Sequence, residues 1–222
     1  MVKCLISCWI SACTLHLLYQ QLHCFIGPYK DLTECPSCKK AQFKAKGEPH
    51  KYFNYIPVIP WLQTMSANTI HAKKMHYWAN HVHEPGVIKD VFNGSHYQSL
   101  LNTIVPGGED NLFFYFSNEH DIALALLTDS FAPFRKHNKT CWPIILFSYN
   151  LPPEIHFQKK YCIHIATVPG PKKPWDWDSF CWPLVQELIQ LEMGVKAFDA
   201  IRHYCYFTPI SFLHLVTFPL WP

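Results

Sequence analysis

One acidic residue stands where an apolar segment is expected to end as a strand. Residues 121–129 read DIALALLTD, in which large apolar side chains alternate with small ones up to Asp129. This alternation predicts a strand, and two further short apolar runs follow at 143–149 and 162–168. A carboxylate at the exit of a central strand is a position from which phosphoryl-transfer nucleases hold a metal ion. The alternative is that Asp129 only forms a turn with the backbone amides that follow it.

Three cysteines in the first part of the chain have the spacing of metal ligands. Cys35 and Cys38 enclose Pro-Ser, a CxxC spacing that lets two thiolates meet one tetrahedral zinc ion. Cys24 precedes Cys35 by eleven residues and is a candidate third ligand. A redox pair and a turn without metal are the alternatives to zinc. Three histidines are candidates for the fourth ligand: His16, His23 and His50.

Four histidines farther along the chain also invite a metal interpretation. They lie on or near an expected helix that carries aromatic residues together with Lys73 and Lys74. On such a helix, histidines are more often surface or core-edge residues than ligands. We therefore expect no metal site at His71, His76, His81 and His83.

Positive charge concentrates in the second half of the chain, although the formal net charge is only +3. Between residues 132 and 173, seven Lys and Arg accompany one acid, Glu154, which leaves this segment with a charge of +6. A cluster of this kind can neutralise the phosphates of DNA, and the alternative is a set of ordinary solvated loop charges. The seven candidate DNA-binding residues are Arg135, Lys136, Lys139, Lys159, Lys160, Lys172 and Lys173.

Composition favours a folded chain. Of the 222 residues, 49% are hydrophobic and only 16% are charged, so long disorder is not expected and a sizeable core is. Six of the ten cysteines fall in the first 38 residues, and the other four lie in apolar segments typical of buried free thiols in a reducing compartment. The apolar start of the chain has three interpretations: a cleaved leader, a packed apolar segment, or an artefact of gene prediction.

Three segments together resemble a known family. TDSFAPF at 128–134, CWPIILFSYNLPPEI at 141–155 and VPGPKKP at 168–174 resemble, in this order, the transposases of CACTA-type (En/Spm-like) DNA transposons in their fungal form. The stretches YIPVIPWLQ at 55–63 and KKMHYWANH at 73–81 are similar to the helical linker of that family. The resemblance extends over about residues 23–199 and is expected to stop beyond Ala200.

The resemblance implies cut-and-join transposition on a ribonuclease-H-like sheet, where three carboxylates hold two Mg²⁺ or Mn²⁺ ions. It assigns Asp129 to the first of these acids and places the other two beyond residue 222. The family most often has Gly after this Asp, where Ser130 would be strained if its φ were positive. We therefore expect a truncated transposase that is inactive as given, with DNA as its partner, self-association, no membrane partner and a nuclear location.

Two other functions remain open. The first is a non-catalytic DNA- or protein-binding module that has kept the Cys knuckle and the basic loops. The second is a small secreted cysteine-rich protein, which would require that the leader is real and the cysteines are paired.

The expected fold class is α/β. We expect a partial ribonuclease-H-like mixed sheet with a packed helix, preceded by a small Cys knuckle and a helical linker. Strands are expected at 111–116, 121–129, 143–149 and 162–168. The helix is expected over 179–193, with Ser179 as its cap, Pro183 in its first turn and Gly194 at its end, because four apolar residues recur at helical spacing: Phe180, Leu184, Leu188 and Leu191.

Five segments are expected along the chain. They are an apolar leader or artefactual segment (1–22), a Cys knuckle with candidate zinc (23–48), a helical linker (49–104), the first half of a ribonuclease-H-like domain (105–199) and a divergent apolar tail (200–222). In the linker, an apolar turn at Trp61–Met65 precedes a helix capped by Asn68 or Thr69. The tail contains no Asp or Glu and is assigned no function. Half a sheet leaves an open edge and an apolar face, so low solubility is expected.

Overall fold

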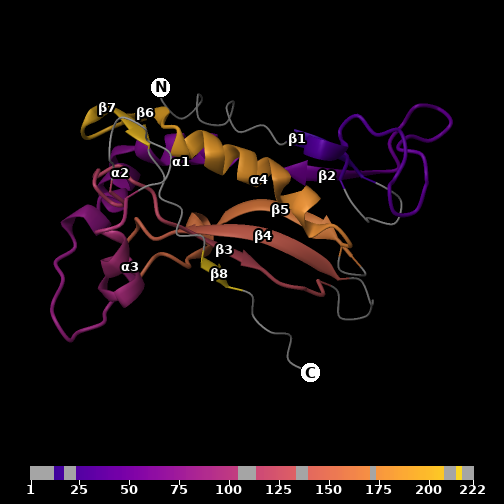
Figure 1. Cartoon of the computed structure of the whole chain (residues 1–222). Helices are drawn as coiled ribbons and strands as arrows, with labels where there is room; N and C mark the ends of the chain where they lie inside the picture. The colour runs from indigo at the N-terminus through magenta and orange to yellow at the C-terminus, as the bar shows by residue number, and fades with distance from the viewer. Residues whose placement is uncertain are drawn as a thin grey trace.

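A six-stranded mixed sheet forms the centre of the protein, with strand order β1-β2-β5-β4-β3-β8 (Figure 1). The computed structural model describes residues 13–17, 24–104, 114–133, 140–170, 174–207 and 214–216. Neighbouring strands are antiparallel except β3 and β8, which are parallel. The strands are β1 (Cys13–Leu17), β2 (Lys51–Tyr55), β3 (Leu124–Thr128), β4 (Cys141–Ser148), β5 (Ile163–Pro169) and β8 (His214–Val216). The expected α/β class with a mixed sheet is confirmed.

The three strands predicted from apolar segments form the middle of the sheet. In β3, β4 and β5, alternate side chains enter one apolar cluster and are at most 5% exposed: Leu124, Leu126, Ile144, Leu146, Ile163 and Ile165. Burying a side chain of this size stabilises the fold by about 1.5–3 kcal/mol. The alternating pattern therefore selects which face of the sheet is covered, and α4 lies along that face (Figure 1).

The other strands correct the expected plan. The strand expected at 111–116 is absent from the sheet in the part that is described, where Phe114 forms only an isolated bridge with Ile104, and 111–113 lie outside the described residues. Instead, β2 comes from the expected helical linker, β1 from the expected leader and β8 from the expected tail. Phe53 and Tyr55 of β2 point into the core, and Leu15 of β1 pairs with Phe53. The places of β1, β2 and β8 in the sheet depend on pairing between distant segments, which no local pattern reveals.

The helix predicted on the sheet is α4 (Trp177–Glu192). Its apolar stripe is confirmed, because Phe180, Leu184 and Leu191 are buried. Its cap is Asp176 rather than Ser179, since the Asp176 carboxylate accepts a hydrogen bond from the Ser179 N–H at 3.2 Å. With the helix starting earlier, Pro183 lies beyond the first turn, where it removes one backbone hydrogen bond. The helix ends as expected before Gly194, whose φ is +89°.

Three further α-helices belong to the linker: α1 (Val58–Ser66), α2 (Thr69–Met75) and α3 (Ser95–Leu100). α1 begins directly after Pro57 and is longer than the predicted turn, while Asn68 caps α2 as predicted. The short 3-10 helices are η2 (Gly27–Tyr29), η3 (Trp78–Asn80), η4 (Val91–Asn93) and η5 (Lys159–Tyr161). None of the helices in the described part of the chain has the length and apolar character needed to cross a membrane.

A two-stranded hairpin of β6 (Val195–Asp199) and β7 (His203–Phe207) follows α4. It packs against α1, because the Ser66 hydroxyl donates a hydrogen bond to the Phe198 carbonyl at 3.0 Å and the Ala200 N–H donates to the Ser66 carbonyl at 2.9 Å. The hairpin thereby places Asp199, at the end of β6, close to the linker helices.

Candidate functional site

Asp129 lies directly after β3, as the sequence predicts for the candidate catalytic acid. Its Oδ1 accepts a hydrogen bond from the backbone N–H of Ser130 at 2.6 Å, which is the local turn that needs no metal. Among the described residues, only Lys39, Phe116 and His203 have a positive φ without being glycine. The serine at position 130 is therefore not strained.

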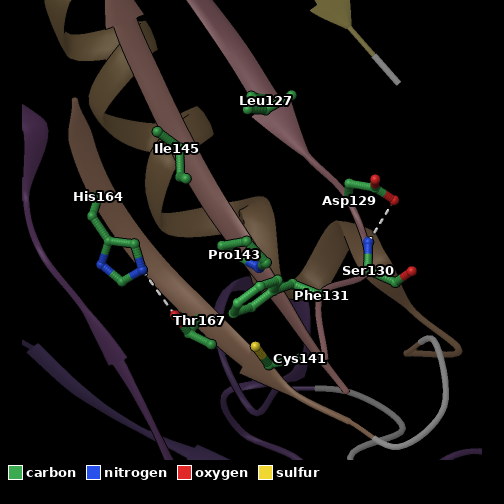
Figure 2. A pocket seen from close by; sticks show the side chains of 9 residues that line it. All are labelled: Leu127, Asp129, Ser130, Phe131, Cys141, Pro143, Ile145, His164 and Thr167. Carbon is green, nitrogen blue, oxygen red and sulfur yellow. Dashed lines mark hydrogen bonds between the residues drawn. The ribbon is translucent and has the colours of Figure 1, made fainter. Parts of the chain in front are cut away.

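Asp129 lines a hollow of about 490 Å³ on the face of the sheet turned away from α4 (Figure 2). Its walls are mostly apolar, and the only polar contact between two of its side chains joins His164 Nε2 and Thr167 Oγ1 at 2.8 Å. Asp129 is the one acid among the residues that line it: Leu127, Asp129, Ser130, Phe131, Cys141, Pro143, Ile145, His164 and Thr167. The arrangement offers a single carboxylate, and a single carboxylate binds Mg²⁺ weakly.

The two basic loops, 134–139 and 171–173, are each flanked by residues at the end of the sheet where Asp129 lies. Phe131 and Cys141 exchange two backbone hydrogen bonds of 2.8 Å, and the Gly170 N–H donates to the Thr140 carbonyl at 2.8 Å. A Cβ at position 170 would lie 2.2 Å from that carbonyl oxygen, so this close approach requires glycine. Five of the predicted DNA-binding residues lie in the connecting segments, outside the described residues: Arg135, Lys136, Lys139, Lys172 and Lys173.

Lys159 and Lys160 are not part of the same group. They lie in η5, which precedes β5, whereas residues 171–173 follow the other end of β5 and residues 134–139 precede β4, whose first residue pairs with that end. A strand of this length separates its ends by about 20 Å. The segment with a charge of +6 is therefore divided between opposite ends of the sheet.

A second small basic group forms around Tyr161, and the sequence did not reveal it. The Lys74 Nζ donates a hydrogen bond to the Tyr161 hydroxyl at 2.7 Å, and the Lys160 Nζ lies 4.9 Å from the ring centre. The ring of His71 lies 5.7 Å from that of Tyr161, and burial together with the two lysines lowers the pKa of His71. We refer to His71, Lys74, Lys160 and Tyr161 as the Tyr161 cluster.

The CxxC segment forms a tight turn. The Cys38 N–H donates to Cys35 Sγ at 3.3 Å, the Lys39 N–H donates to the Cys35 carbonyl at 2.9 Å, and Lys39 has a φ of +58°. Amides directed at a sulfur stabilise a thiolate, so the turn suits two ligands of one metal ion.

Cys24, the candidate third ligand, lies in a different apolar cluster from Cys35 and Cys38. It is in the main core, where burial raises the pKa of its thiol to about 12. None of the seven cysteines whose side chains are described forms a disulfide, as the sequence predicts for the four later ones.

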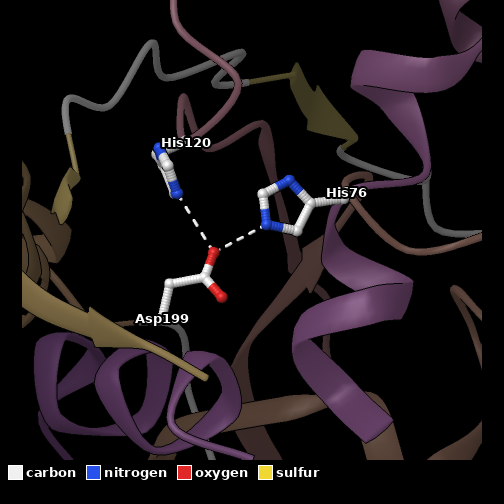
Figure 3. Close-up of side chains that lie close together, drawn as sticks. All are labelled: His76, His120 and Asp199. Carbon is white, nitrogen blue, oxygen red and sulfur yellow. Dashed lines mark hydrogen bonds and ion pairs between the residues drawn. The ribbon is translucent and has the colours of Figure 1, made fainter. Parts of the chain in front are cut away.

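Among the described residues, one group of three potential metal ligands is close enough to share an ion, and it consists of His76, His120 and Asp199 (Figure 3). The Asp199 Oδ2 lies 2.6 Å from His76 Nε2 and 3.0 Å from His120 Nε2. Burial alone would raise the pKa of Asp199, but hydrogen bonds from the Ile201 N–H and from His76 outweigh it and hold the pKa below its usual value. Of these three residues, only His76 could be singled out from the sequence, because the members of the group are separated by at least 44 positions.

These features define an α/β protein whose mixed sheet carries a lone acid at a strand exit, with basic loops leaving the same end. A family model described as transposase family tnp2 matches residues 109–220. The chain belongs to this family of transposases. No curated protein and no solved structure matches the chain.

The family match includes every strand of the central sheet from β3 onward, together with α4 and the β6–β7 hairpin. It also runs through residues 200–220, so the expectation that family resemblance stops beyond Ala200 is wrong. Transposases act on DNA, and an interaction with DNA therefore follows in general terms from membership of the family.

Proposed function

We propose that this protein is a CACTA-type, transposase-derived DNA-binding protein that has lost strand cleavage and transfer. The observation that carries the proposal is the position of Asp129, alone at the exit of β3, in a chain of the tnp2 family. In the ancestral enzyme, this carboxylate would hold one of two Mg²⁺ or Mn²⁺ ions that activate the attacking oxygen and stabilise the leaving oxygen.

The strand order supports a ribonuclease-H-like sheet. β3, β4 and β5 form an antiparallel meander, α4 follows, and β8 returns parallel to β3 on its free side. This is the strand order expected of a ribonuclease-H-like sheet that begins at β3, with Asp129 directly after that strand.

The surroundings of Asp129 support the loss of catalysis. Leu127 of β3 pairs with Val216 of β8, so the two strands end close together. β8 itself, His214–Val216, supplies no carboxylate to stand beside Asp129. In the part of the chain that the structure describes, no group of three potential ligands includes Asp129.

DNA binding is assigned to the basic loops that leave the sheet near Asp129. Their five basic residues would contact phosphates, whereas Lys159 and Lys160 lie at the far end of β5. Phosphate contacts release counterions, so the logarithm of the binding constant falls with the logarithm of salt concentration by about 0.9 for each contact.

The test measures binding of the purified chain to a fluorescent random-sequence duplex between low and physiological salt. Replacing the five loop residues by Ala should weaken binding and reduce the salt slope by up to about 4.5. The matched control is Lys89→Ala, which removes one charge already paired with Glu84 and should leave the slope unchanged within about one contact. Binding that is weak and independent of salt would contradict DNA binding.

A second arm tests catalysis on the same duplex with Mg²⁺ or Mn²⁺. We expect no nicking by the parent and equal DNA affinity for Asp129→Asn. Metal-dependent nicking that Asp129→Asn abolishes would contradict the loss of activity.

A further inference from the structure

We propose that His76, His120 and Asp199 form a site for a divalent transition-metal ion, with zinc as the best match (Figure 3). The site would fasten three segments: the end of α2, the loop before β3 and the end of β6. It is separate from Asp129 and from the Cys knuckle, and it does not depend on the proposed DNA binding.

The ligand atoms already converge. One ligand atom from each of His76, His120 and Asp199 lies within 4.8 Å of the other two, and the two nitrogen–oxygen distances are 2.6 and 3.0 Å. Tetrahedral zinc with bonds near 2.0–2.1 Å holds its ligand atoms about 3.3 Å apart. To admit the ion, the His76–Asp199 pair would therefore separate by about 0.7 Å and the His120–Asp199 pair by about 0.3 Å.

Each imidazole has an acceptor oxygen near both of its nitrogens. His120 Nδ1 lies 3.2 Å from the Asn118 Oδ1, and His76 Nδ1 lies 3.8 Å from the Glu119 carboxylate. The His76 Nε2–H donates to Asp199, and a zinc ion would take the place of this proton. The oxygens near Nδ1 would then face the remaining N–H of each neutral ring.

Outer partners of this type orient the ligands in metal sites. Asp199 is 2% exposed, and its Oδ1 accepts hydrogen bonds from the N–H groups of Ile201 at 2.7 Å and Arg202 at 3.3 Å, which leaves Oδ2 for the ion. Arg202 also approaches the Glu119 carboxylate at 3.3 Å. The carboxylate is thus fixed before any ion binds.

The chemistry of the ligand set favours zinc. Two imidazole nitrogens and one carboxylate oxygen are ligands of intermediate hardness, which suit zinc better than Mg²⁺ or Ca²⁺, since these two ions require oxygen. Both imidazole side chains are 12% exposed, so the site is closed to bulk solvent on most sides. A site of this kind stabilises the fold more readily than it supplies catalysis.

The test uses the full chain with Cys35→Ser and Cys38→Ser, which removes the knuckle as a competing site. Calorimetric titration with Zn²⁺ should give about one ion per chain. Co²⁺ should give visible absorption bands without the charge-transfer band of a thiolate ligand. At a zinc concentration 100 times the Kd, the Tm should rise by about 5 °C or more.

Each of His76→Asn, His120→Asn and Asp199→Asn should weaken zinc binding by roughly 100-fold or more, and Glu119→Gln by about tenfold through its outer contact. His164→Asn, at an exposed histidine outside the group, is the matched control and should bind zinc like its parent. If Asp199→Asn fails to fold, the His120 and Glu119 variants still decide the outcome. A folded double-serine chain that binds neither Zn²⁺ nor Co²⁺, or a His120 variant that binds zinc undiminished, would overturn the proposal.

Discussion

A single carboxylate, Glu187, has a structural role at the edge of the apolar face of α4. It lies three residues after Leu184 and four before Leu191. It accepts hydrogen bonds from the backbone N–H groups of Val58 at 2.8 Å and Ile59 at 3.0 Å, and from the Tyr55 hydroxyl. These amides begin α1 and have no partner within their own helix. Glu187 therefore caps a helix from outside, where a negative charge also complements the helix dipole.

Glu187→Ala should lower the free energy of unfolding by about 2 kcal/mol, because it leaves two amides and a hydroxyl without their acceptor. Urea unfolding at neutral pH measures the change. The control is Glu192→Ala, at an exposed position on the same helix, which should change stability by less than about 0.5 kcal/mol. An equal, small effect of both variants would show that Glu187 is not a cap.

At the scale of the elements, local pattern explains what could be predicted. β4, β5 and α4 each bury a stripe that is continuous in sequence, so their existence follows from side-chain periodicity. Periodicity does not tell which residue caps α4, because Asp176 and Ser179 are both good capping residues three positions apart. β2 lies between Pro49 and Pro57 in a segment that was expected to be helical, so no strand was predicted there. His76, His120 and Asp199 come from the end of α2, a loop and β6, and they lie close together only in the completed fold.

The CxxC turn is a candidate zinc site that metal analysis can test. The Cys38 N–H points at Cys35 Sγ, so we expect the parent chain to lose about one zinc ion when Cys35 and Cys38 are both replaced by Ser. Elemental analysis of dialysed protein measures the loss, with Cys162→Ser as control. Unchanged zinc content would exclude the turn as a site.

Cys24→Ala tests the candidate third ligand of the same ion. Loss of the zinc ion would support Cys24 as a ligand, and retention of the zinc ion would show that Cys24 is not one.

At the scale of the whole molecule, the central sheet draws its strands from segments that the sequence had assigned to unrelated regions. β1 from the expected leader forms one edge, and β8 from the expected tail forms the other. At the β1 edge of the sheet, β1 and β2 are joined by five residue pairs, and Leu15 is partly buried against the main core. A removable leader would contribute nothing to folded stability, whereas an edge strand covers the backbone groups of its neighbour.

Deletion of residues 1–17 therefore distinguishes the leader from the edge strand. If β1 belongs to the fold, its removal exposes β2, and the Tm should fall by about 4–8 °C, which corresponds to a loss of about 2 kcal/mol in a chain of this length. Self-association in sedimentation should increase, because β2 then presents unpaired backbone groups. Deletion of residues 1–12 is the matched control, since it keeps β1 and should leave the Tm within about 2 °C of the parent. If both deletions behave like the parent, β1 is dispensable, and the core formed by β2 to β8 and α4 carries the stability by itself.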